Sequence, residues 1–74
     1  MVLNTKSIGA KCAYFRKKIL GKTQQQVAND VFIDRSRVSN FEKGTNTSYI
    51  ILSWYISNGL LDTFSLRELG LYND

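Results

Sequence analysis

The side chains best placed to do chemistry gather in residues 35–43, RSRVSNFEK. At 3.6 residues per turn, a helix over this segment turns Val38 and Phe41 to one side and a polar set to the other. The polar set contains only hydrogen-bond donors and hydroxyls, without an acid or a large apolar group: Arg35, Ser36, Ser39, Asn40 and Lys43. This face offers hydrogen bonding and positive charge rather than a paired acid and base.

Side chains suited to catalysis or metal binding are scarce elsewhere. There is no His, which removes imidazole acid–base chemistry and the commonest zinc ligand. A single Cys12 forms neither an internal disulfide nor a thiolate cluster, which fits a reducing cytoplasm. The six acids lie at least four positions apart: Asp30, Asp34, Glu42, Asp62, Glu68 and Asp74. We therefore expect a cytoplasmic binding module, not an enzyme, with no cofactor and no metal.

The charge is distributed unevenly along the 74 residues. Ten Lys and Arg against six Asp and Glu leave a net charge of +4. Residues 1–44 hold nine bases and three acids, a net of +6, whereas residues 45–74 hold one base and three acids, a net of −2. This asymmetry indicates a face for a polyanion and a separate role for the C-terminal third.

The spacing of apolar residues predicts an all-α chain of four or five helices in a single domain over residues 1–74. A first helix is expected over about residues 6–20, with an inward stripe of Ile8, Cys12, Phe15 and Ile19. Cys12 is accordingly expected to be a buried small hydrophobe rather than a reactive thiol.

Polar residues mark the starts of the remaining helices. Thr23 and Gln26 have the spacing of a capping box and begin a second helix, and Asp34 stands where it can cap the third. Ser65 and Glu68 repeat the capping-box spacing and predict a short helix near residues 66–69. Two short helices joined by a four-residue turn, the second with a polar outer face, form a helix-turn-helix over about residues 23–44.

The fourth predicted helix, beginning near Tyr49, is apolar nearly all round. We expect Ile50, Ile56 and Leu60 to pack on the other helices, which leaves a second apolar side for a homodimer interface: Ile51, Leu52, Trp54 and Tyr55. A dimerisation segment would then span about residues 48–74. The alternative is that the C-terminal tail covers this side, since it offers Phe64, Leu66, Leu69 and Leu71.

The segment 23–44, TQQQVANDVFIDRSRVSNFEKG, resembles the Cro-like repressor family, also called the xenobiotic-response-element type of helix-turn-helix. Ile8-Gly9 and Phe15-Arg16 resemble that family's first helix, with one extra residue before Thr23. The matching positions in the segment are Thr23-Gln24, Val27-Ala28, Val31, Ile33, Arg35-Ser36, Val38-Ser39, Phe41-Glu42 and Gly44. The resemblance implies a lambda-repressor-like domain that binds double-stranded DNA.

The resemblance also implies a role for individual residues. The positions that would face base edges in the major groove are Arg35, Ser36, Ser39 and Asn40, and their side chains suit that task. The positions expected to contact DNA phosphates are Gln24, Arg37, Lys43 and Asn46, although the angle of Arg37 is also compatible with packing along the helix side. Arg16 matches a residue that pairs with the position of Glu42, so this ion pair is expected to be structural.

Two positions depart from the family pattern. Phe32 stands in the turn where the family usually has Gly, and a left-handed Phe32 would store strain. We therefore expect the turn to adopt another geometry and to tilt the third helix. Ser48 replaces a nearby Pro and is expected to cap the fourth helix instead.

These features together predict a transcriptional regulator, most simply a phage-like repressor, that binds an inverted-repeat operator as a homodimer. Two alternatives remain at this point. An antitoxin of the same fold would use its apolar helix to cover a toxin, and an antirepressor is a further possible protein partner. An adaptor that has lost DNA binding would keep the fold only.

Overall fold

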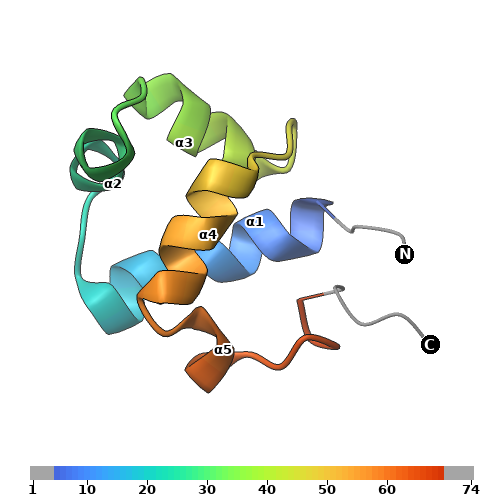
Figure 1. Ribbon diagram of the computed structural model, residues 1–74. Coiled ribbons are helices and arrows are strands. Elements are labelled where there is room, and N and C mark those ends of the chain that lie inside the picture. The colour runs from blue at the N-terminus through green and yellow to red at the C-terminus, as the bar shows by residue number, and fades with distance from the viewer. Residues whose placement is uncertain (1–4, 70–74) are drawn as a thin grey trace.

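The computed structural model describes residues 5–69, and within this range the chain forms five helices and no strand (Figure 1). The first, α1 (Thr5–Tyr14), continues directly into a π-helical segment, η1 (Phe15–Leu20). The remaining helices are α2 (Gln24–Val31), α3 (Arg35–Lys43), α4 (Tyr49–Ser57) and α5 (Leu60–Thr63). The all-α prediction is confirmed. No helix in the described part of the chain combines the length and apolar character needed to cross a membrane.

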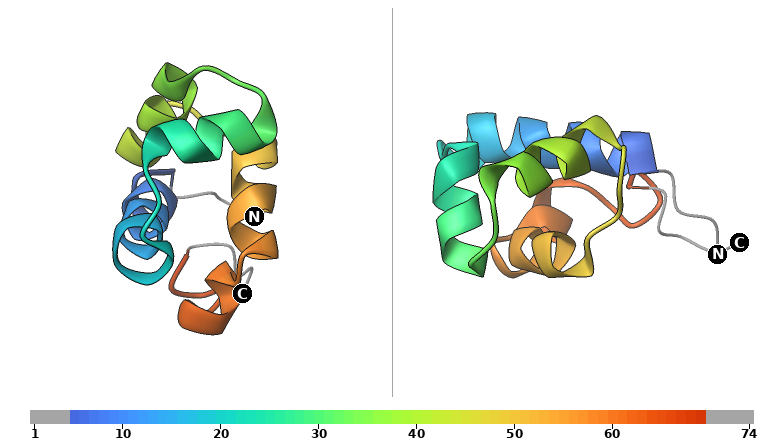
Figure 2. Two further views of the ribbon diagram at one scale, coloured as in Figure 1. Left: turned by 90° about the vertical axis from the view of Figure 1, so that its left-hand side faces the viewer. Right: turned by 90° about the horizontal axis from the view of Figure 1, so that it is seen from above.

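Helix α3 lies across one end of the molecule, where the other helices leave its outer side uncovered. It packs against α1 and α2, while α4 contacts α2 and α5. The view from above in Figure 2 shows α1 on one side of α3 and α4 on the other, with nothing over α3 itself. The inward side of α3 is therefore held by its neighbours, and its outer side faces solvent.

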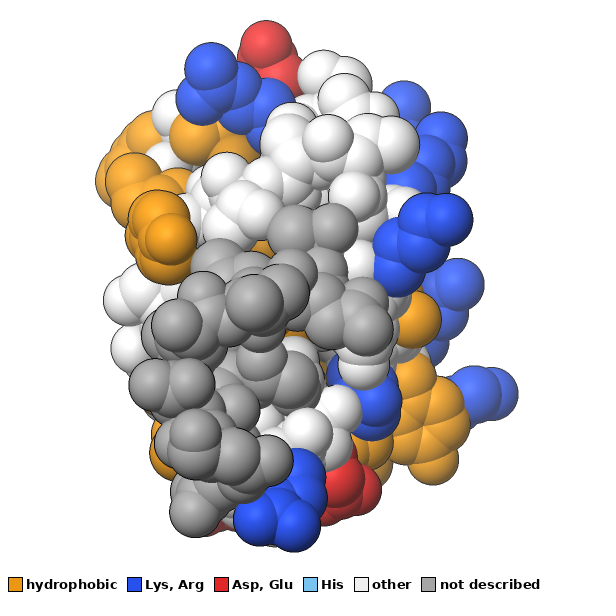
Figure 3. Space-filling view, turned by 90° about the vertical axis from the view of Figure 1, so that its right-hand side faces the viewer, with side chains coloured by type: hydrophobic (Ala, Val, Ile, Leu, Met, Phe, Trp, Pro, Cys, Tyr) orange, Lys and Arg blue, Asp and Glu red, His pale blue; other side chains and the backbone are white. Residues whose placement is uncertain are grey.

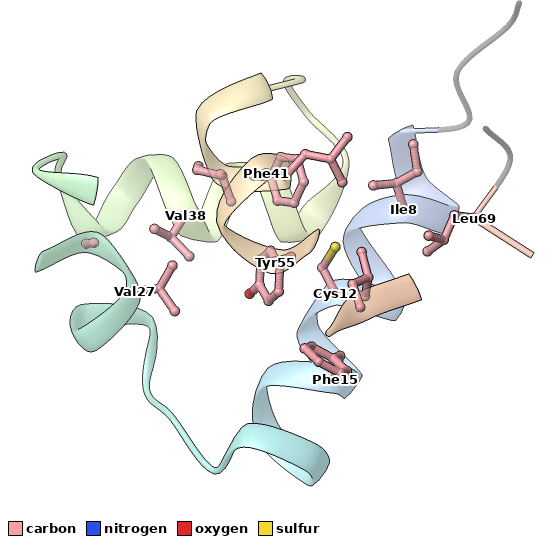
Figure 4. Close-up of a cluster of buried hydrophobic side chains, with 12 residues drawn as sticks. Ile8, Cys12, Phe15, Val27, Val38, Phe41, Tyr55 and Leu69 are labelled. Atoms are coloured by element: carbon pink, nitrogen blue, oxygen red, sulfur yellow. The ribbon is translucent and has the colours of Figure 1, made fainter. Parts of the chain in front are cut away.

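The core is built around the ring of Tyr55, which is fully buried. Its centroid lies 6.2 Å from that of Phe41 in a stacked arrangement and 6.3 Å from that of Phe15 in an edge arrangement. Figure 4 shows Tyr55 between side chains of α1 and η1 on one side and of α2 and α3 on the other. The full cluster is Ile8, Cys12, Phe15, Val27, Ala28, Val38, Phe41, Ile51, Leu52, Tyr55, Leu60 and Leu69.

The first helix is continuous as predicted, but its C-terminal third is π-helical, and this moves one residue off the buried stripe. Ile8, Cys12 and Phe15 are buried, whereas Ile19 is 54% exposed, so its assignment to the core was wrong. A π-helical turn holds more residues than an α-helical turn and rotates the side chains that follow it. Burial raises the pKa of the Cys12 thiol to about 12, and the thiol therefore stays protonated and unreactive.

Two of the predicted helix caps are present. The Thr23 hydroxyl accepts from the Gln26 amide at 3.1 Å while the Gln26 side chain accepts from the Thr23 amide at 2.8 Å, a complete capping box. The Ser48 hydroxyl accepts from the Ile51 amide at 3.4 Å at the start of α4. These local bonds satisfy amides that the first turn of a helix leaves without a partner.

Two other expectations about helix ends need correction. Asp34 occupies the N-cap position of α3 in an extended conformation, but its carboxylate makes no capping hydrogen bond. Ser65 and Glu68 form their reciprocal hydrogen bonds at 3.0 and 3.1 Å, yet residues 66–69 make only a turn. The fifth helix is instead α5, earlier in the chain.

The two sides of α4 were assigned the wrong way round. Ile51, Leu52 and Tyr55, predicted at a dimer interface, are buried in the core of the single chain, and Trp54 is half-buried with its indole Nε1 donating to Asp30 at 3.2 Å. Ile50 is instead 58% exposed. Ile56 is also exposed, whereas Leu60 is buried as expected. The tail alternative is supported in part, since Leu69 is buried and Phe64 half-buried while Leu66 is exposed, and Leu71 lies outside the described residues.

Phe32 closes α2 in the left-handed conformation that the sequence led us not to expect. Its φ and ψ are 59° and 46°, and its amide donates to the Ala28 carbonyl. The side chain is 93% exposed, so little packing offsets the steric cost of this conformation. The turn thus keeps the geometry that glycine usually provides, and the expected departure from that geometry was wrong.

We predict that Gly9→Ala destabilises the protein by about 2–3 kcal/mol, because α1 and α3 have no room for a methyl group there. A Cβ at Gly9 would lie 2.4 Å from the Phe41 carbonyl oxygen and 2.6 Å from that of Glu42. Gly21→Ala is the control, since its Cβ would meet nothing within 4 Å and only the positive φ of 63° opposes it. Urea unfolding should show a loss of only about 1 kcal/mol for the control. An equal loss in both variants would contradict the close approach.

We predict that Phe32→Gly raises the free energy of unfolding by about 0.5–1 kcal/mol, because glycine adopts the left-handed conformation without a Cβ clash. Phe32→Ala is the matched control, since it removes the exposed ring but retains the Cβ. It should leave the stability of the monomer nearly unchanged in urea unfolding. Loss of stability in Phe32→Gly would show that the ring contributes packing that outweighs the strain.

Candidate functional site

A buried ion pair between η1 and α3 lies beneath the polar face of α3. Arg16 Nε donates to Glu42 Oε2 at 2.8 Å and Arg16 Nη2 donates to Glu42 Oε1 at 2.9 Å. Both side chains are 6% exposed, and the third donor, Arg16 Nη1, reaches the Lys22 carbonyl at 2.8 Å. This is the bidentate form of the pair, and it confirms the structural role expected for Arg16 and Glu42.

Two further helices donate to the same carboxylate. The Tyr55 hydroxyl of α4 donates to Glu42 Oε2 at 2.6 Å, and Gln24 Nε2 of α2 donates to Glu42 Oε1 at 3.0 Å. No side-chain nitrogen or oxygen buried in the described range lacks a partner. We call Arg16, Gln24, Glu42 and Tyr55 the Glu42 cluster. It joins four successive helical elements through one side chain.

The hydrogen bonds decide the charge state of the cluster. Burial by itself raises the pKa of the Glu42 carboxyl, but hydrogen bonds from Arg16, Tyr55 and Gln24 outweigh it and hold that pKa below its ordinary value. Burial and the bond to Glu42 raise the pKa of the Tyr55 phenol, which stays protonated as the donor. The carboxylate is therefore ionised and the phenol neutral throughout the physiological pH range.

Gln24 connects the Glu42 cluster to the first residue of α3. Its amide nitrogen is bound to Glu42, and its amide oxygen accepts from Arg35 Nη1 at 3.3 Å. The guanidinium of Arg35 remains exposed and has further donors free to bind a ligand. The buried carboxylate thus orients, through one intervening amide, a side chain that the sequence predicted to contact DNA.

The remaining polar side chains of α3 lie on its uncovered side. Ser36, Asn40 and Lys43 are exposed and Ser39 is half-buried. Within residues 5–69, none of these four side chains has a hydrogen-bond or ion-pair partner. Glu42, the one acid of α3, points inward to Arg16. The polar face therefore carries donors and hydroxyls in the absence of any carboxylate, as the helical spacing predicted.

The four residues predicted to contact phosphates do not form one group. Lys43 and Asn46 are exposed at and just beyond the end of α3, and Gln24 is half-buried at the start of α2. Arg37 lies instead on the flank of α3 that faces α4. It lines two shallow hollows, one with Phe32, Ile33 and Asp34, the other with Asn46, Thr47 and Ser48.

Two members of the Glu42 cluster were not predicted as such. Tyr55 was assigned to a dimer interface and Gln24 to a phosphate, and neither was connected with Glu42. The available signal was that Tyr55 carries a phenol hydroxyl in a largely apolar helix, since a buried phenol needs a hydrogen-bond partner. Nothing in the spacing of Gln24 indicates its bond to Glu42, because 18 positions separate the two residues.

We predict that Glu42→Gln destabilises the protein by about 3 kcal/mol, because it leaves the buried Arg16 guanidinium without a counter-charge. The wild-type stability should also fall with pH. A carboxyl whose pKa is lower in the folded protein contributes stability above its unfolded pKa of about 4.5, and this is lost as pH falls through the folded pKa.

Urea unfolding between pH 7 and pH 3 provides the measurement. Glu42→Gln should flatten the decline below about pH 4.5, and Asp62→Asn, at an exposed site on α5, should cost far less stability at pH 7 than Glu42→Gln. A Glu42→Gln variant with the stability and the pH profile of the wild type would contradict the role of the cluster.

Comparisons with known proteins leave the face of α3 without an assignment. No family model, no curated protein and no solved structure matches the chain.

Proposed function

We propose that α2, the turn of residues 32–34 and α3 form a helix-turn-helix, and that the polar face of α3 binds in the major groove of double-stranded DNA. One observation carries the proposal. The uncovered side of α3 presents unpaired donors and no acid, and a buried network holds its first residue, Arg35, in place. A helix with such a face fits the width of the major groove, where base edges offer acceptors.

Base reading is assigned to Arg35, Ser36, Ser39 and Asn40. A guanidinium can bind the O6 and N7 of guanine together, and an amide can do the same with the edge of adenine. The bond from Arg35 to Gln24 uses one of five guanidinium hydrogens and restricts the rotation of the rest. A donor held in this way loses less conformational entropy on binding than a free side chain.

Phosphate binding is assigned to Gln24, Lys43 and Asn46. Gln24 Nε2 uses one hydrogen on Glu42 and retains a second, at the N-terminal end of α2, where the amides and the helix dipole favour an anion. Lys43 lies at the other end of the polar face, and Asn46 lies just beyond it. Contacts at both ends of the face would fix the register of α3 on the duplex.

In this proposal the protein acts as a transcriptional regulator, most simply a repressor that occupies its operator. Two copies would place their α3 helices in successive major grooves, about 34 Å apart, so that an inverted repeat is the expected site. A homodimer on DNA is therefore part of the proposal.

Selection of binding sites from random DNA duplexes tests the proposed sequence-specific binding. We expect a sequence to be enriched, and Asn40→Ala to relax the preference at one position by about 1–3 kcal/mol. Failure to enrich any sequence would reject the proposed regulator.

The salt dependence of binding to the selected site provides a matched pair of variants. Lys43→Ala should weaken binding and reduce the slope of log affinity against log salt by about 1, because one phosphate contact is lost. Lys18→Ala removes another exposed charge, from η1 and not from the polar face of α3, and should leave both the affinity and the slope unchanged. Equal effects of the two changes would indicate attraction by net charge alone.

A further inference from the structure

A row of side chains runs along one side of α1 and into η1. Its members recur at intervals of three and four residues, which places them on one side of a helix. The last member belongs to η1, but four positions make about one turn in a π-helix as well, so the row continues straight. We call this row the lysine edge: Lys6, Ala10, Ala13 and Lys17.

The lysine edge lies beside α3 because α1 packs closely on that helix. A Cβ at Gly44, directly after α3, would lie 2.7 Å from the Cα of Lys6. At the other end of the row, Arg16 precedes Lys17 and binds Glu42 of α3 at 2.8 Å. The view from above in Figure 2 shows α1 running alongside α3. The lysine edge therefore borders the polar face on the side of α1.

Both charges of the lysine edge are available to a ligand. Lys6 and Lys17 are exposed, and neither has a hydrogen-bond or ion-pair partner within residues 5–69. The sequence of α1 and η1 contains no acid. Figure 3 shows Lys and Arg side chains along one edge of the molecule with no acidic side chain among them. The row between the two lysines is made of alanines, so no large side chain keeps a flat or convex ligand away.

We propose that the lysine edge binds the sugar–phosphate backbone of the duplex in which α3 lies, on the strand that borders the major groove on the side of α1. About 15 Å separate Lys6 from Lys17 along the helix, and one strand carries a charge every ~3.4 Å of duplex, so the two lysines reach different phosphates. The proposal rests on the proposed function for the placement of α3 in the groove.

The chemistry of the lysine edge assigns it to orientation rather than to sequence reading. An ammonium group binds phosphate as a point charge and carries no geometric preference for a base edge. Contacts from α1 would therefore strengthen binding to every duplex equally and hold α3 in one orientation across the groove. The base preference would remain with the polar face of α3.

Lys18 provides the matched control for position. It is exposed, carries the same charge and follows Lys17 directly, but one position turns it by about a quarter of a turn away from the row. A contact at the lysine edge depends on Lys17 and not on Lys18, whereas attraction by net charge depends on both.

The salt dependence of binding by the full chain tests the lysine edge, on the selected duplex and on a duplex of unrelated sequence. Lys6→Ala and Lys17→Ala should each reduce the slope of log affinity against log salt by about 1 on both duplexes. The base preference should stay that of the wild type in both variants. Lys18→Ala should leave both slopes unchanged. Urea unfolding should show wild-type stability for all three variants, because the side chains are exposed.

Neutral methylphosphonate linkages, placed one at a time in the selected duplex, locate the contacts. The wild type should lose affinity at two phosphates of one strand, one for each lysine. Lys17→Ala should lose no further affinity at one of these two phosphates and Lys6→Ala none at the other, because the contact is already absent.

The outcomes separate this proposal from the proposed function. Wild-type slopes in Lys6→Ala and Lys17→Ala, or an equal reduction in Lys18→Ala, would overturn the lysine edge while sequence selection by α3 stands. If no sequence is selected but Lys6 and Lys17 still set the slope on any duplex, sequence reading fails and the lysine edge stands. A protein that binds no duplex would overturn both.

Discussion

The structure depends on one buried carboxylate. Glu42 accepts hydrogen bonds from η1, α2 and α4 while it belongs to α3, so its two oxygens determine how four successive elements meet. The arrangement is stable only when complete, since an ionised group in a core is costly unless it is fully paired. The cluster consequently fixes one orientation of α3 relative to its neighbours. Close approach of α1 to α3 at Gly9 restricts the same helix near its C-terminal end.

The charge and the order of the outer side of α3 follow from the contacts that its inner side makes. Because Glu42 points inward, the polar face has no negative charge, and because Gln24 joins Glu42 to Arg35, the first donor on that face is oriented before any ligand arrives. Stability and the proposed recognition therefore use the same side chains. Phe32 stabilises nothing in the single chain, since its left-handed conformation is sterically costly and its exposed ring adds little packing.

Local signals predicted local structure well. The capping box of Thr23 and the cap at Ser48 follow from short spacings, and the pair of Arg16 and Glu42 followed from resemblance over a longer range. The sides of α4 could not be assigned, because a helix that is apolar nearly all round has no periodicity to orient it. The side of α4 that faces the core is the side from which the Tyr55 hydroxyl donates to Glu42, a contact between residues 13 positions apart. Ile19 was misplaced for a different reason, since the π-helical segment changes the angle between residues.

The central claim is that the Glu42 cluster holds α3 so that its polar face enters the major groove. Methylation interference at guanine N7 on a selected duplex tests this most directly, because that atom lies on the floor of the major groove. The account predicts interference at guanines in two successive major grooves on one side of the duplex, and its loss at the contacted guanine in Arg35→Ala. Binding that is insensitive to N7 methylation would contradict it.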